Sequence, residues 1–273
     1  MGNKQLARKY YITGFIMLGI ILLMLLMSFI WTPYSPEATD ASSKLLAPCA
    51  EHIFGTDNLG RDLFSRVVDA AKYTVFISAS GVIVALILGT IMGIPAGYFG
   101  GQVDKAIMLI ANTIMCFPGI LLALVAVAVF GPSLFNVIWA LGLVFAPTFA
   151  RVYRTEVIKI KEREYILQAK ILKVNPVRIM AVHIFPNLLS QIIPAIVIGL
   201  ANMTLFESAM SYLGLGVQPP HASFGKILSD SQSYITRAPW LFIFPSLALI
   251  IYILGLYFIS EGVRVTFSKG GDR

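Results

Sequence analysis

Few side chains in this sequence could bind a metal ion or form a disulfide. His52 and His221 lie in polar segments, where two histidines could indicate metal handling. No group of histidine, cysteine and carboxylate residues has the short ligand spacing of a metal site, so we expect structural or solvent-exposed histidines and no bound metal. Cys116 lies in an apolar run and Cys49 in a polar segment, which predicts two unpaired thiols.

Catalytic machinery is not visible in the sequence either. The G-x-x-x-x-G-K-S/T loop, whose amides and lysine hold the phosphates of ATP, does not occur. No combination of a nucleophile with an activating base is recognisable. We therefore expect that this chain is not an enzyme and that it binds no cofactor itself.

Glu207 is an acidic residue close to the end of a long apolar run, residues 188–212. If that run crosses a membrane, a carboxylate there is costly and requires an explanation. One interpretation is that Glu207 lines a transport pathway and meets a cationic substrate or a partner subunit. The other is that Glu207 lies at the membrane boundary, paired with Ser208 or with a neighbouring helix.

The composition points to a membrane rather than to water. Of the 273 residues, 57% are hydrophobic and 13% are charged, whereas soluble domains carry about 25% charged residues. The net charge of +7 could suggest nucleic acid, but the basic residues flank apolar runs, as membrane topology requires.

The apolar runs predict an all-α, polytopic membrane protein with six spanning helices. A helix rises about 1.5 Å per residue, so about 20 residues cross a hydrocarbon core of about 30 Å. The first run follows three basic residues and lacks a small-residue cleavage site after it, which predicts a retained helix rather than a signal peptide. The predicted spans are residues 12–30, 74–97, 106–130, 134–150, 188–212 and 239–260.

Five of these spans contain a proline. Proline lacks a backbone donor and crowds the preceding turn, so we expect kinks in these helices. The prolines are Pro95, Pro118, Pro147, Pro194 and Pro245.

Lysine and arginine residues indicate the orientation in the membrane. With a cytoplasmic N-terminus, 15 of them lie inside and 6 outside, which favours cytoplasmic termini and a cytoplasmic loop over residues 151–187. Residues 31–72 and 213–238 would lie outside. The chain then divides into an N-terminal part with the first helix and an outer segment, a transmembrane core and a short tail, over residues 1–72, 73–265 and 266–273.

Three glycines recur every fourth residue on the second predicted span, at Gly89, Gly93 and Gly97. Small residues at this spacing let two helix backbones approach closely in lipid. The contact could be with another subunit or a gate, or it could be ordinary packing within the chain, which we favour.

The loop over residues 151–187 is a basic, amphipathic segment between two strongly apolar runs. Glu162 and Glu164 suit the start of a helix, and Asn175-Pro176 suits the cap and first position of a second one. Such a helical elbow could dock a partner protein or lie on the lipid surface. The apolar face predicted on the first helix consists of Tyr165, Ile166, Ala169 and Leu172, and that on the second of Val177, Met180, Ala181 and Ile184.

Three blocks of sequence resemble the peptide/nickel family of ATP-binding-cassette (ABC) importer permeases, over roughly residues 10–265. The loop from Glu164-Tyr165 through Ala169, Leu172 and Pro176 to the HIFPN segment 183–187 resembles their "EAA" loop. FGTDNLGRDLFSR over residues 54–66 resembles the block after their first span, and SYLGLGVQPP over 211–220 the block after their fifth.

This resemblance implies a type I importer permease fold, the shorter "C-type" subunit, in a bacterial or archaeal plasma membrane. Its implied partners are a second, homologous permease, two cytoplasmic ATPases that carry ATP and Mg, and an extracytoplasmic substrate-binding protein. The implied substrates are di- and oligopeptides or nickel and metal chelates. The residues implied to couple the ATPase to the spans are Glu164, Tyr165, Ala169, Leu172, Lys173 and Pro176.

Lys173 departs from the family pattern, which usually has glycine there. Glycine forms a left-handed turn cheaply, so we expect the turn at Lys173 to be made differently. An ion-gradient-driven secondary transporter remains an alternative function. It would need charged residues at the midplane and internal repeats, and only Glu207 comes near to that requirement.

Overall fold

The computed structural model describes residues 2–267, and every named element in this range is a helix. This confirms the all-α prediction. The elements are α1 Gly2–Ile30, η1 Ala41–Ser43, α2 Leu63–Phe99, α3 Gly101–Met115, α4 Gly119–Phe130, α5 Leu134–Ile160, α6 Glu164–Ile171, α7 Pro176–Arg178, η2 Ile179–Ile184, α8 Phe185–Tyr212, α9 Phe224–Ser231, η3 Gln232–Tyr234 and α10 Trp240–Phe267.

Among the described residues, five helices are long and apolar enough to cross a membrane, namely α1, α2, α5, α8 and α10. The span predicted over 106–130 is not one straight helix. It is broken between α3 and α4, which are bent by 85°. Pro118 lies at the break and disfavours helical geometry in Phe117, so the apolar run cannot continue as a single rod. The pair completes six spans if it counts as one.

Several helices run further than the hydropathy predicts: α1 begins at Gly2 rather than residue 12, α10 ends at Phe267 rather than residue 260, and α2 and α5 are also longer. We expected the second span to begin at residue 74, but α2 begins at Leu63, where the Asp62 carboxylate accepts from the amide of Ser65 at 2.8 Å. The predicted division at residue 72 therefore falls inside α2. Likewise α5 does not end at residue 150 but continues to Ile160, because its last turns bury Tyr153, Val157 and Ile160 in the main hydrophobic cluster. Arg154 on the same turns forms an ion pair with Asp104 of α3.

The helix that leads into α8 changes pitch beside a proline. Residues of α7 are followed by the π-helical segment η2, and α8 then begins at Phe185. Pro186 cannot donate to the carbonyl of Val182, and its ring crowds that carbonyl, which accounts for the wider turns. The prolines at 95, 147, 194 and 245 each lie inside one continuous helix.

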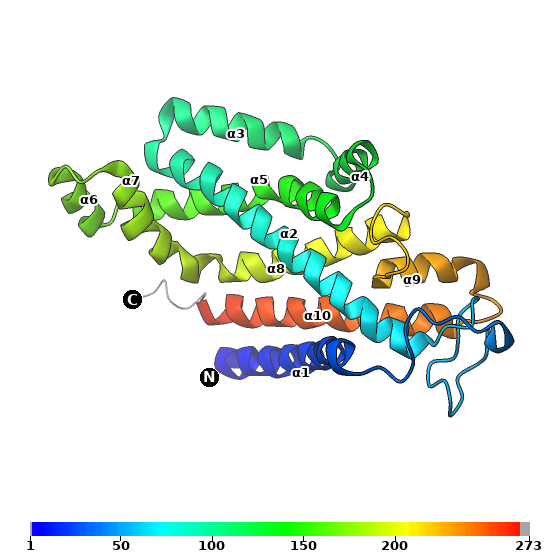
Figure 1. Cartoon of the computed structure of the whole chain (residues 1–273). Coiled ribbons are helices and arrows are strands. Elements are labelled where there is room, and N and C mark those ends of the chain that lie inside the picture. Colours follow the sequence, from blue (N-terminus) through cyan, green and yellow to red (C-terminus); the bar gives the residue numbers. More distant parts are fainter. Residues whose placement is uncertain (1, 268–273) are drawn as a thin grey trace.

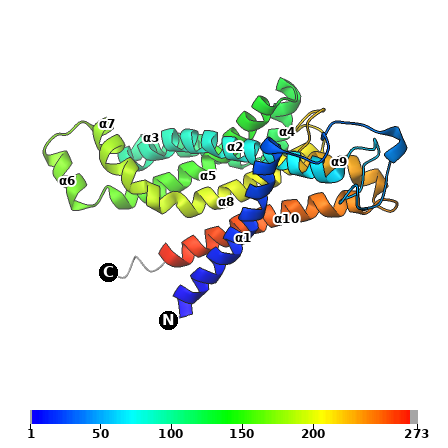
Figure 2. The ribbon, with the colours of Figure 1, turned by 60° about the horizontal axis from the view of Figure 1, so that its bottom comes forward.

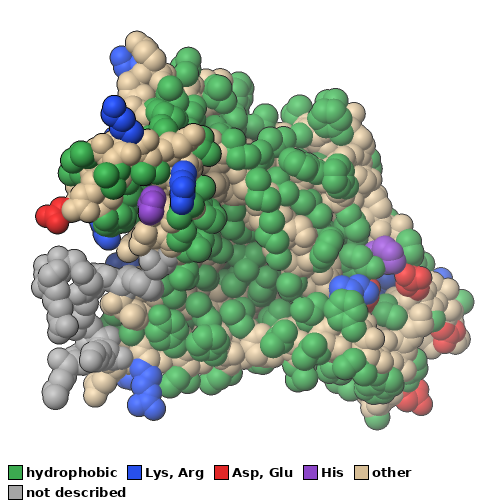
Figure 3. Space-filling view, turned by 60° about the vertical axis from the view of Figure 1, so that its left-hand side comes forward, with side chains coloured by type: hydrophobic (Ala, Val, Ile, Leu, Met, Phe, Trp, Pro, Cys, Tyr) green, Lys and Arg blue, Asp and Glu red, His purple; other side chains and the backbone are tan. Residues whose placement is uncertain are grey.

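Helix α5 lies at the centre of the bundle, packed against α2, α4 and α8, while α1 lies along α10 (Figure 1). The main hydrophobic cluster includes Leu141, Phe145 and Phe149 of α5. The start of α1 and the end of α10 lie at the same end of the molecule as α6 and α7, here termed the α6 end (Figures 1 and 2). The opposite, α9 end carries residues 31–62 and α9. Figure 3 shows hydrophobic side chains across the middle of one face, with charged side chains towards its two sides.

The glycine series on α2 packs against α5 within this chain. A Cβ atom on Gly89 would lie 2.6 Å from Cβ of Phe149, one on Gly93 would lie 2.4 Å from the carbonyl oxygen of Ala150, and one on Gly97 would lie 2.7 Å from Cβ of Val157. The second of our two interpretations, packing within the chain, is therefore confirmed. Glycine is required because the two backbones are too close for any side chain.

Ion pairs hold the α9 end together. Arg61 Nε lies 2.7 Å from Asp57, Arg66 Nε lies 3.5 Å from the same carboxylate, and Arg66 also reaches Asp230 at 3.8 Å. His52 Nδ1 lies 2.9 Å from Asp62. These contacts tie the segment before α2 to α2 itself and to α9.

Candidate functional site

Helix α6 lies at the α6 end and turns one narrow face towards the bundle. Ile166 and Ala169 are buried and belong to the main hydrophobic cluster, together with Ile179 and Ile184 of η2. Glu164 is exposed in the first turn of α6, where a negative charge complements the helix dipole. The elbow is therefore anchored by its inner face and is open to solvent or a partner on its outer face.

Large apolar side chains on this outer face are strongly exposed. The exposed fraction is 78% for Ile171, 77% for Leu172 and 66% for Val177. Tyr165 and Leu167 are also exposed. These five residues are termed the exposed knob. The single face predicted for Tyr165, Ile166, Ala169 and Leu172 was wrong, because Ile166 and Ala169 point inwards whereas Tyr165 and Leu172 point outwards.

The error has a local cause. Helix α6 ends at Ile171, so Leu172 is a cap residue and no longer follows the face of Ala169. Sequence reasoning also missed Leu167 and Ile171. Their apolar character in a polar loop was the available signal, but the boundary of α6 decides which side they face.

The turn after α6 is made in the way that glycine would make it. Lys173 has φ of 53°, in the left-handed region. The amide of Val174 donates to the carbonyl of Ala169 and the amide of Lys173 to that of Lys170, both at 3.0 Å. This is the Schellman pattern. Our expectation of a different turn was wrong, because these two hydrogen bonds hold lysine in a conformation that it otherwise avoids.

The second arm of the elbow begins as predicted. The side-chain oxygen of Asn175 accepts from the amide of Val177 at 2.8 Å, and Pro176 occupies the first helical position. Two lysines tie the elbow to the end of α2: Lys161 Nζ donates to the carbonyl of Gly97 at 2.9 Å, and Lys170 Nζ lies 5.3 Å from the centre of the Tyr98 ring.

Glu207 lies at the other end of the bundle and is completely buried. Its carboxylate accepts from Ser211 Oγ at 2.7 Å and from Ser208 Oγ at 3.3 Å, and Ser211 Oγ in turn accepts from the amide of Val217 at 3.2 Å. A Cβ atom on Gly225 would lie only 2.0 Å from the carbonyl oxygen of Ser208. This arrangement corresponds to the second alternative, a carboxylate paired within the chain, and it ties the segment after α8 to α8.

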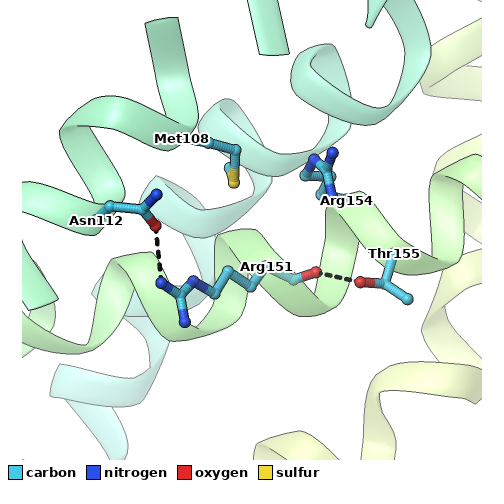
Figure 4. A pocket seen from close by; sticks show the side chains of 5 residues that line it. All are labelled: Met108, Asn112, Arg151, Arg154 and Thr155. Carbon is cyan, nitrogen blue, oxygen red and sulfur yellow. Dashed lines mark hydrogen bonds between the residues drawn. The ribbon is translucent and has the colours of Figure 1, made fainter. Parts of the chain in front are cut away.

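A third group of polar residues lines a pocket between α3 and α5. Arg151 Nη2 donates to the side-chain oxygen of Asn112 at 2.7 Å (Figure 4). Arg154 forms two hydrogen bonds of 2.5 and 2.6 Å with Asp104. Sequence reasoning treated Arg151 as the first charge of a loop. Its helical spacing from Thr148 and Thr155 could have indicated a polar face on α5.

The long apolar helices, the broken span and the elbow together define a multi-pass, all-α membrane protein. The chain belongs to the family of binding-protein-dependent transport system inner membrane components, which matches residues 59–270.

Two relatives that are named as permease proteins are similar in sequence to nearly the whole chain. A dipeptide transport system permease protein of Alkalihalophilus pseudofirmus is 39% identical over 262 residues, covering 96% of this chain and 86% of that protein. A nickel transport system permease protein of Escherichia coli K12 is 34% identical over 249 residues, covering 91% of this chain and 90% of that protein.

Among solved structures, an inward-facing form of the MetNI methionine ABC transporter has a similar fold. The TM-score is 0.54 at 18% identity, and the match covers 70% of this chain and 93% of that chain. The resemblance seen in the sequence is thus confirmed: the protein is a permease subunit of a binding-protein-dependent ABC importer, a transport subunit of the inner membrane. The alternative of an ion-gradient-driven secondary transporter is not supported.

Proposed function

We propose that this chain and a second, homologous permease form a path for di- or oligopeptides, or for nickel or metal chelates. Two ATPases, which carry ATP and Mg and hydrolyse the ATP, bind at the α6 end in the cytoplasm. A substrate-binding protein docks at the α9 end outside. The dipeptide and nickel relatives support these two substrate classes.

The exposed knob is the observation that carries this proposal. Several large apolar side chains exposed on one short elbow favour burial against a partner protein. Lys170, Lys173 and Arg178 surround them and are exposed. Charged and apolar residues mixed in this way suit a docking face with an apolar centre and a polar rim.

The six residues implied by the family take two kinds of role in this proposal. Glu164, Tyr165 and Leu172 contact the ATPase, since all three are exposed. Ala169 is buried and positions α6 on η2, while Lys173 and Pro176 fix the angle between the two arms. ATPase closure then changes the relative stability of inward- and outward-facing packings of the bundle.

The orientation belongs to the same proposal, with both termini in the cytoplasm. The excess of lysine and arginine supports it, as does the position of the start of α1 and the end of α10 at the α6 end (Figure 1). In this arrangement residues 1–72 hold the first helix and an outer segment, and 73–265 hold the permease core with its cytoplasmic loop. Most of the proposed cytoplasmic tail, 266–273, lies outside the described residues.

Co-purification with the ATPases tests the docking face. Leu172→Arg puts a charge into the apolar centre and Glu164→Ala removes an exposed carboxylate, so both variants are expected to retain less ATPase than wild type, Leu172→Arg about tenfold less. Leu213→Arg is the matched control, because Leu213 is also exposed but lies at the α9 end. It should retain the ATPase fully.

Equal ATPase recovery with Leu172→Arg and with wild type would show that the elbow is not the docking element. Uptake measurements then address the energy source and the substrate. Uptake of a labelled dipeptide or of nickel should require the co-expressed ATPase, and it should persist when the ion gradient is collapsed while ATP is maintained.

A further inference from the structure

Helix α5 is buried on most of its surface but has one exposed polar stripe. Thr148, Arg151 and Thr155 are exposed, whereas their neighbours Ala150 and Tyr153 are buried. The spacing of three and four residues places all three on one side of the helix. The stripe runs along the half of α5 that leads to the α6 end.

A polar stripe on a helix long enough to span a membrane indicates contact with water. Lipid-facing positions favour apolar side chains, whereas polar and charged residues within spans face a cavity or the interior of a bundle. Opposite the stripe, α3 contributes Met108 and Asn112, and these residues line an open pocket of about 370 Å³ together with Arg151, Arg154 and Thr155 (Figure 4). This volume is at the small end for ligand sites, enough for one end of a peptide rather than a whole large ligand.

The two arginines of this pocket differ in their partners. Arg154 is neutralised, because both Asp104 oxygens accept from its guanidinium. Arg151 donates only to the neutral side-chain oxygen of Asn112, and in the part of the chain that the structure describes no carboxylate lies within 4.0 Å of it. Asn112 therefore orients the Arg151 guanidinium without cancelling its charge.

A guanidinium held in this way suits an anionic oxygen. Arginine stays charged at every physiological pH and presents five donors in a planar fork that matches a carboxylate. With one donor used on Asn112, an edge remains for the ligand. A bare divalent cation would instead be repelled by the net positive charge of the pocket.

We propose that Arg151, oriented by Asn112, binds a carboxylate of the substrate in the half of the translocation path next to the α6 end. The site selects for peptides or other carboxylate-bearing substrates over bare metal cations. This inference rests on the proposed function and adds to it the substrate class and a specificity-determining residue.

The first experiment uses the complete importer in nanodiscs, with the binding protein and both ATPases. Uptake of a dipeptide with a free C-terminal carboxylate is compared with uptake of its C-terminal amide. Arg151→Gln is expected to lower uptake of the free dipeptide about tenfold, as for the loss of one charge-assisted hydrogen bond, and to leave the amide unchanged. Arg151→Lys should retain most activity, and Lys105→Gln, which removes a neighbouring cation of α3, should have no effect.

ATP hydrolysis stimulated by the binding protein is measured in the same samples. If it persists in Arg151→Gln but the two peptides respond equally, the importer function stands and the carboxylate site is wrong. If it is missing in wild type as well, the proposed function itself has failed.

Thiol labelling tests the site even where wild type does not transport the amide. In a Cys49→Ser, Cys116→Ser background, Thr155→Cys should react with a charged methanethiosulfonate from the aqueous phase. The free dipeptide should slow this reaction when Arg151 is present and not in the Arg151→Gln variant. No labelling in any nucleotide state, or equal protection in both variants, would overturn the proposal.

Discussion

Lys173 and Gly214 occupy the same kind of backbone position with different side chains. After α8, the amide of Leu215 donates to the carbonyl of Met210 at 3.0 Å and φ of Gly214 is 84°. After α6 the same pattern is made with lysine. A non-glycine residue in this region costs about 1–2 kcal/mol, whereas glycine loses about 0.5–1 kcal/mol in unfolded-state entropy. The lysine is thus a small local destabilisation in the elbow.

We expect Lys173→Gly to stabilise the protein by about 0.5–1 kcal/mol, since relief of the left-handed strain exceeds the entropy loss. Gly214→Lys should destabilise it by about the same amount, since it is the reverse change in the same motif. Thermal unfolding in nanodiscs compares the two variants with wild type. A lower unfolding temperature for Lys173→Gly would show that the lysine side chain contributes contacts of its own to the elbow.

At Glu207 the hydrogen bonds and the charge can be separated by substitution. Glu207→Gln keeps an oxygen that accepts from Ser211, so we expect stability within about 1 kcal/mol of wild type and unchanged uptake. Glu207→Leu leaves the hydroxyls of Ser208 and Ser211 without this acceptor, so we expect a loss of about 2–3 kcal/mol.

Thermal unfolding and uptake are measured on the same Glu207 samples. A strong loss of uptake in Glu207→Gln without loss of stability would instead indicate that the carboxylate takes part in the pathway.

At the scale of elements, the contact between α2 and α5 depends on the absence of side chains. Gly93→Val would place Cβ 2.4 Å from the carbonyl oxygen of Ala150, so the helices must separate, with an expected loss of about 2–3 kcal/mol. Gly19→Ala on α1 is the control, because no atom lies within 4 Å of its added Cβ. Unfolding in nanodiscs should show no loss for the control. Equal stability of Gly93→Val and wild type would show that α2 and α5 are not held at this distance.

Hydropathy predicted the elements well where a helix lies wholly in an apolar environment. The starts of α5 and α10 came within a residue of the prediction, because the apolar runs begin there. The bend between α3 and α4 was not predicted, since an apolar run continues through it. The last turns of α5 were not predicted either, because their burial in the main hydrophobic cluster and the ion pair of Arg154 with Asp104 are tertiary contacts.

For the whole molecule, sequence blocks identified the family and the elbow but not the arrangement that positions individual side chains. The cap at Asn175 could be predicted from two adjacent residues. Three other features could not be predicted, because each depends on which helices become neighbours. They are the burial of Ala169, the burial of Glu207 and the pocket at Arg151. Periodicity shows that a face exists, whereas only packing shows what that face meets.

The length of helix α2 allows it to connect the two ends of the molecule mechanically. Its 37 residues extend about 55 Å, well beyond a hydrocarbon core of about 30 Å. At one end Lys161, just before α6, donates to the carbonyl of Gly97 at 2.9 Å, and near the other end Arg66 Nη2 lies 3.8 Å from Asp230 of α9. A rigid helix that contacts elements at both ends of the molecule can transmit a movement from one end to the other. At this length a tilt of about 5° would move the far end by about 5 Å, so we expect a small movement of the elbow to displace the α9 end.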